Sequence, residues 1–89
     1  MTFSLPLILL LIQYCPWYIP SVPVFILPTT EYEVLVEEIN PDLKNTLGFA
    51  YFKNGVVKQE DCKIVLKDTA HLEVICHEYK HCVVGLWHD

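Results

Sequence analysis

The chain has 89 residues, a net charge of −5 and no arginine. This length allows one small domain, and an acidic chain whose only cations are lysines lacks the positive surface that nucleic-acid binding needs, so no nucleic-acid partner is expected. All six lysines and all eleven acidic residues lie from Glu31 onward, which separates an uncharged first third from a charged remainder.

Residues 1–20 are expected to form an apolar leader. Residues 5–12 have the length of a signal-peptide hydrophobic region and are too short to span a bilayer. No basic residue precedes them and no small-residue cleavage site precedes Cys15. We therefore expect a membrane anchor through residues 3–19 or an uncleaved signal, with a cleaved signal or a buried strand as alternatives. The expected location is membrane-associated or secreted, with the cytoplasm as the alternative.

Residues 21–89 are expected to form an α+β domain that begins with a strand at 22–27. Thr30 and Glu33 have the spacing of a capping box, which predicts a helix over 31–39. The apolar stripe of this helix consists of Tyr32, Leu35, Val36 and Ile39. Its acidic side chains are expected to form a solvated face without a catalytic role.

The middle of the chain predicts a β-hairpin. Residues 47–53 are aromatic and β-prone, Asn54-Gly55 is a strong two-residue hairpin signal, and residues 56–58 can return antiparallel. A further strand is expected at 62–67.

A final helix is expected over residues 70–84, with Asp68 or Thr69 as its cap. Tyr79 should point into the core from this helix. The resulting order is strand, helix, strands, helix.

The four cysteines, at positions 15, 62, 76 and 82, allow two disulfides in an oxidising compartment. Cys76 and Cys82 lie about 240° apart around one predicted helix, so they should not pair with each other. A bridge from Cys62 to either of them is geometrically open. We expect instead that Cys76 and Cys82 are small buried apolar residues.

The C-terminal helix contains the motif HExxH at residues 77–81. Histidines four residues apart lie one above the other on a helix, so the imidazoles of His77 and His81 project toward one point and form half of a tetrahedral zinc site. Glu78 lies about 100° around the same turn, where it can reach a metal-bound water without binding the metal. It is the candidate general base.

A third ligand has to come from beyond the helix. Gly85 can end the helix and turn the chain back, so that His88 reaches the same ion. The predicted ligands of Zn²⁺ are therefore His77, His81 and His88, with Asp89 as the next choice for the third position.

The whole pattern, HExxHxxxGxxHD, resembles the zincin metallopeptidases, whose metzincin branch has HExxHxxGxxH. One additional residue separates His81 from Gly85 here, so that Trp87 takes the register of the third metzincin histidine. Small zincins with an HExxHC ending, many of them phage-encoded, are more similar. The resemblance implies a minimal zincin-like fold, a strand edge that binds an extended substrate, and hydrolysis of a peptide or protein, cell-wall peptide included.

Two functions of other classes stay open. In a non-catalytic zinc-stabilised module, Glu78 would be idle. In a small membrane-associated protein, such as a lysis accessory, the HExxH motif would be accidental. The sequence leaves the oligomeric state open.

Overall fold

The computed structural model describes residues 3–43, 45–52 and 59–85. Its elements, in chain order, are helix α1 (Leu5–Tyr14), strand β1 (Val24–Leu27), helix α2 (Thr29–Ile39), 3-10 helix η1 (Pro41–Leu43), strand β2 (Gly48–Phe52), 3-10 helix η3 (Gln59–Asp61), strand β3 (Cys62–Lys67) and helix α3 (Leu72–Val84). The predicted α+β class is confirmed.

The three strands form one sheet in the order β1-β3-β2. β1 runs parallel to β3, with Val24 opposite Ile64, and β2 runs antiparallel to β3, with Gly48 opposite Leu66. A parallel pair needs a crossover connection, and α2 lies in the connection between β1 and β3. The central strand β3 is buried on both faces, which explains why Ile64, Val65 and Leu66 are consecutive apolar residues.

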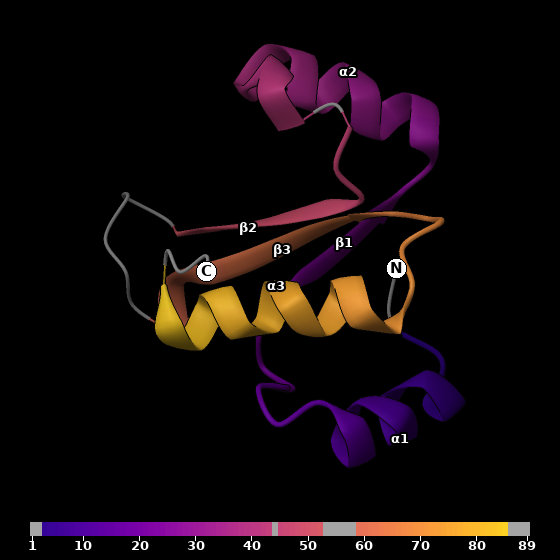
Figure 1. Ribbon diagram of the computed structural model, residues 1–89, viewed down its shortest axis with the longest axis vertical. Coiled ribbons are helices and arrows are strands. Elements are labelled where there is room, and N and C mark those ends of the chain that lie inside the picture. The colour runs from indigo at the N-terminus through magenta and orange to yellow at the C-terminus, as the bar shows by residue number, and fades with distance from the viewer. Residues whose placement is uncertain (1–2, 44, 53–58, 86–89) are drawn as a thin grey trace.

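The elements are stacked in layers, with α2 on one face of the sheet, α3 on the other, and α1 on the far side of α3 (Figure 1). One core cluster, containing Tyr32 and Phe49, fills the space between α2 and the sheet. A second cluster joins Ile64 of the sheet, Tyr79 of α3 and Leu11 of α1. Helix α3, which carries the HExxH motif, is therefore held between two layers.

Helix α1 has 10 residues, and its Leu11 is fully buried. In the part of the chain that the structure describes, no helix is long and apolar enough to cross a membrane. The domain boundary expected at residue 20 stays a prediction.

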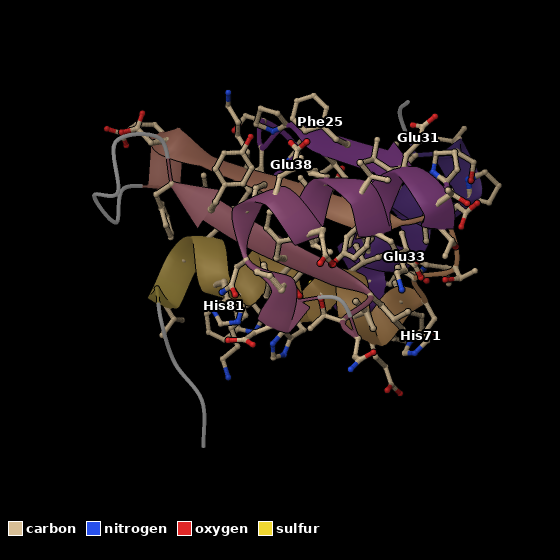
Figure 2. The ribbon with its side chains drawn as sticks, turned by 90° about the horizontal axis from the view of Figure 1, so that it is seen from above. Phe25, Glu31, Glu33, Glu38, His71 and His81 are labelled. Atoms are coloured by element: carbon tan, nitrogen blue, oxygen red, sulfur yellow. A yellow bond between two sulfur atoms is a disulfide. The ribbon has the colours of Figure 1, made fainter. Side chains whose placement is uncertain are left out.

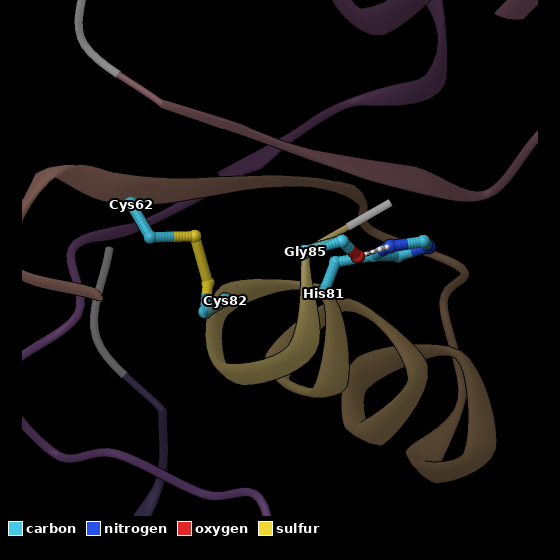
Figure 3. The surroundings of a disulfide bond; sticks show 4 residues. All are labelled: Cys62, His81, Cys82 and Gly85. Carbon is cyan, nitrogen blue, oxygen red and sulfur yellow. Dashed lines mark hydrogen bonds between the residues drawn. A yellow bond between two sulfur atoms is a disulfide. The ribbon is translucent and has the colours of Figure 1, made fainter. Parts of the chain in front are cut away.

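The expectation that Cys76 and Cys82 are unpaired is wrong. Cys82 forms a disulfide with Cys62, one of the two bridges that the sequence leaves open, and their Cα atoms are 5.5 Å apart (Figure 3). Cys76 pairs with Cys15, whose Cα lies 5.6 Å away across a sequence separation of 61 residues. This second bridge forms because the segment after α1 folds back onto α3.

Both predicted helix caps are also wrong. α2 begins at Thr29 after Pro28, and α3 begins at Leu72 after His71, in each case without a side-chain cap. The amide of Ala70 donates to the carbonyl of Lys67 at 3.0 Å, so a turn that ends β3 delays the start of α3. The Asp68 carboxylate accepts a hydrogen bond from the Thr29 hydroxyl at 3.2 Å instead of capping a helix.

The predicted stripe of α2 is confirmed where the helix covers the sheet. Tyr32 and Val36 are fully buried, whereas Ile39, the last residue of the helix, is 58% exposed. Glu31 and Glu38 are exposed on the outer side (Figure 2). The Asn54-Gly55 turn and residues 56–58 lie outside the described residues, and the described partner of β2 is β3.

Candidate functional site

Helix α3 brings His77 and His81 together, as their spacing predicts. Their Nε2 atoms are 3.2 Å apart, and the two rings meet edge to face with centroids 4.8 Å apart. Two nitrogens bound to one tetrahedral zinc ion at about 2.0–2.1 Å would be roughly 3.3 Å apart. The observed pair therefore has nearly the spacing that a shared metal ion requires.

The other ring nitrogen of His81 is bound to the end of the same helix. Nδ1 of His81 lies 2.9 Å from the Gly85 carbonyl oxygen (Figure 3). Because a carbonyl only accepts, Nδ1 carries the proton, and Nε2 of the neutral ring keeps its lone pair. In the metal-free protein the Nε2–H of His77 can then donate to His81. This tautomer of His81 is the one that binds metals through Nε2.

Gly85 makes this hydrogen bond through an unusual backbone conformation. It ends α3 with φ 83° and ψ −147°, close to a region that is essentially restricted to glycine. The sequence indicates Gly85 as a helix terminator, and the structure adds that its carbonyl orients His81.

Glu78 is buried between α3 and β2, with 6% of its surface exposed. Burial raises the pKa of its carboxyl group from 4.5 to about 7. No described residue donates a hydrogen bond to this carboxylate. A carboxyl group with a pKa near neutrality can both accept and return a proton at physiological pH, as a general base must.

Gly48 allows this close packing, which the sequence analysis missed. A Cβ atom at Gly48 would lie 2.6 Å from Cδ2 of Leu66, 3.0 Å from the Val65 carbonyl oxygen and 3.6 Å from Cγ of Glu78. A glycine inside a β-prone segment is a known sign of close backbone approach, and this signal was available in the sequence.

The two histidines and Glu78 line one cavity of about 610 Å³. The opposite wall is formed by β2 and the residues before it, including Leu47, Phe49, Ala50 and Phe52. This volume lies in the range of small-ligand sites, about 300–1,000 Å³. A second cavity, of about 410 Å³, adjoins His77 and is lined by Tyr14, Trp17 and Lys80. His77 thus borders both cavities.

The other histidines, Asp89 and Tyr79 do not join this pair in the described structure. His88 and Asp89 lie outside the described residues. His71 precedes the first turn of α3, near the opposite end of the helix from His81 (Figure 2). Tyr79 is buried, as expected, with its ring edge to face against Tyr18 at 5.2 Å, and burial raises its pKa.

Comparisons with protein-family models, curated proteins and solved structures find no match. Within residues 3–43, 45–52 and 59–85, no group of three His, Cys, Asp or Glu side chains could hold a metal ion. The cysteines on either side of the motif form disulfides. The resemblance to the zincin peptidases is therefore wrong. The motif led to a wrong family because HExxH specifies only one face of one helix and carries no information about the fold around it.

Proposed function

We propose that the protein is a zinc-dependent hydrolase that cleaves an amide bond, with His77 and His81 as metal ligands and Glu78 as the general base. One observation carries the proposal: the two Nε2 atoms converge to 3.2 Å while the Gly85 carbonyl holds the other nitrogen of His81. Zinc fits best among common ions because it favours imidazole ligands and tetrahedral geometry.

Two ring nitrogens leave two positions of a tetrahedral zinc ion for other ligands. The sequence predicts His88 as the ligand at one of these two positions, with Asp89 as the next choice. The last position would hold the water that attacks the substrate.

Bound zinc would polarise the substrate carbonyl and lower the pKa of its water ligand toward ~7. Glu78 would accept the proton of this water during attack and return it to the leaving amine. The burial of Glu78 supports this role, because a carboxyl group with a pKa of about 7 holds and releases a proton near neutral pH.

The cavity supports a peptide as the substrate. Its volume of about 610 Å³ accommodates several atoms on each side of a scissile bond, and Ala50 and Phe52 are apolar residues of its β2 wall that lie on the α3 side of the sheet. We include proteins and cell-wall peptides in this class.

The disulfides support a catalytic site over a metal that only stabilises the fold. Cys62–Cys82 already ties α3 to β3, and Cys15–Cys76 ties it to the segment after α1. A metal staple on the same helix would add little, and it would leave the buried carboxylate of Glu78 without a role.

Calorimetric titration of zinc into metal-free, oxidised protein tests the metal site. We expect one ion per chain. His77→Ala or His81→Ala should weaken zinc binding by more than ~100-fold. Loss of a residue that only hydrogen-bonds to a metal ligand lowers metal affinity by about 10–100-fold, and loss of the ligand itself should cost more. His71→Ala is the matched control and should bind zinc normally, since this residue lies outside the pair.

Hydrolysis of a fluorogenic peptide library tests the role of Glu78. The Glu78→Gln variant should still bind zinc and should hydrolyse peptides about 10²–10⁴-fold more slowly than the parent protein. Absence of zinc binding would refute the metal site. Zinc binding with no hydrolysis by the parent protein would favour the non-catalytic module.

A further inference from the structure

Helix α1 carries an exposed apolar flank. Leu5, Leu9 and Ile12 lie on one side of the helix and are 68%, 53% and 60% exposed. Leu11, which lies on a different side of the helix, is fully buried in the core. α1 is the outermost layer of the molecule, beyond α3 (Figure 1).

We propose that this flank lies in the plane of a bilayer surface and anchors the protein to zwitterionic lipid. A helix of 10 residues is about 15 Å long, half of the ~30 Å hydrocarbon core. It is too short to span the bilayer and long enough to bury one face at the interface.

The charge distribution favours lipid as the occupant. Residues 2–30 contain no Asp, Glu, Lys, Arg or His, so inserting the flank desolvates no charge. The same segment lacks the basic residues that bind anionic headgroups, and the chain as a whole carries −5. Binding should therefore be hydrophobic, insensitive to salt and no stronger on anionic lipid.

A second copy of the chain is a less suitable partner for this flank than lipid. The flank is about 15 Å long and about 10 Å wide, so it would bury a few hundred Å² at most. This area is below the roughly 800 Å² per partner of a standard stable interface. Tyr14 ends α1 on the opposite side of the helix from Leu5, and Trp17 packs partly buried beside Lys80 of α3, so neither residue belongs to the flank.

The helix is fixed to the domain that it would anchor. Cys15, which follows its last residue, is bonded to Cys76 of α3, and Leu11 packs in the same core cluster as Tyr79. Docking of α1 would therefore hold the whole domain at the lipid surface. This inference does not depend on the proposed hydrolase activity.

Flotation of the oxidised full chain with phosphatidylcholine vesicles tests the proposal. The parent protein should float with the vesicles, equally in 0.1 M and 0.5 M salt, and no more strongly when phosphatidylserine is added. The triple change Leu5→Ser, Leu9→Ser and Ile12→Ser should reduce the bound fraction at least ~10-fold. The control Val34→Ser with Ile39→Ser changes two exposed apolar residues of α2, on the far side of the sheet, and should float like the parent.

Three results would overturn the proposal: no flotation of the parent, flotation that requires phosphatidylserine and is lost in salt, or a dimer in vesicle-free solution that the triple change abolishes. If the triple variant does not fold, brominated phosphatidylcholine decides the question. A tryptophan placed on the flank, Leu9→Trp in a protein that also carries Trp17→Phe and Trp87→Phe, should be quenched by these vesicles. Absence of this quenching would refute the docking of α1.

Discussion

Replacing Glu78 with glutamine in the metal-free protein should stabilise the fold above pH 7 and leave its stability almost unchanged at pH 4. The carboxyl group has an ordinary pKa of 4.5 and a pKa of about 7 in the folded protein. At pH values between 4.5 and about 7, the Glu78 carboxyl group is ionised in the unfolded chain and protonated in the folded protein. The stability of the parent therefore falls as the pH rises from about 4.5 to about 7.

The size of the effect follows from the two pKa values. At about 1.36 kcal/mol per pKa unit, the difference between about 7 and 4.5 amounts to roughly 3 kcal/mol. The side chain is only 6% exposed, so solvent screening removes little of this. For a domain of this size, ~3 kcal/mol corresponds to a rise in Tm of roughly 10–20 °C.

Thermal unfolding followed by circular dichroism, at several pH values between 4 and 8.5 in the presence of a chelator, measures the effect. The difference between Glu78→Gln and the parent should be near zero at pH 4 and grow to its full size by pH 8. Glu73→Gln is the matched control, because Glu73 is an exposed carboxylate in the first turn of the same helix. Its effect should stay below about 1 kcal/mol.

A pH-independent difference between the two proteins would show that packing, not ionisation, distinguishes glutamine from glutamate at this position. A variant that is less stable than the parent at pH 8 would refute the burial of an uncompensated carboxylate. Either result would also remove the support that burial gives to Glu78 as a general base.

Three further changes follow from the structure. Gly85→Ala should cost about 1–3 kcal/mol in chemical denaturation, because φ 83° with ψ −147° excludes a side chain, and it should weaken zinc binding by displacing the carbonyl that orients its histidine. Gly48→Ala should cost about 1–3 kcal/mol, since its Cβ would lie 2.6 Å from a buried leucine methyl group. Joint replacement of Cys15 and Cys76 by serine should cost about 4 kcal/mol, because the bridge closes a loop across 61 residues.

Each of these changes has a result that would contradict its premise. Normal zinc affinity in Gly85→Ala would mean that its carbonyl does not orient the ligand. A fully stable Gly48→Ala protein would mean that β2 does not approach its neighbours closely. Unchanged stability after removal of the long-range bridge would show that α1 is not tied to the domain in solution.

The elements that local pattern alone determines were predictable. β3 has the predicted bounds 62–67, and α2 ends at the predicted Ile39, because apolar periodicity and the Asn-Pro sequence after the helix act within a few residues. The starts of α2 and α3 were not predictable from caps. Thr29 and Asp68 bind each other across 39 residues, and local capping rules do not include such a contact.

The candidate site was also predictable only where local helix geometry determines it. The facing of His77 and His81 follows from helix geometry, and the structure places their Nε2 atoms 3.2 Å apart. The burial of Glu78 depends on the packing of β2 at Gly48, and the Cys15–Cys76 bridge depends on α1 folding back over α3. Both are tertiary contacts, so the motif alone does not contain them.

The most direct test of the metal site is X-ray absorption spectroscopy of the zinc-loaded protein. We expect a first shell of nitrogen and oxygen at about 2.0–2.1 Å, with multiple scattering from at least two imidazole rings, and one ring fewer in His77→Ala or in His81→Ala. Sulfur scattering at about 2.3 Å, or an oxygen-only shell that both variants leave unchanged, would contradict it.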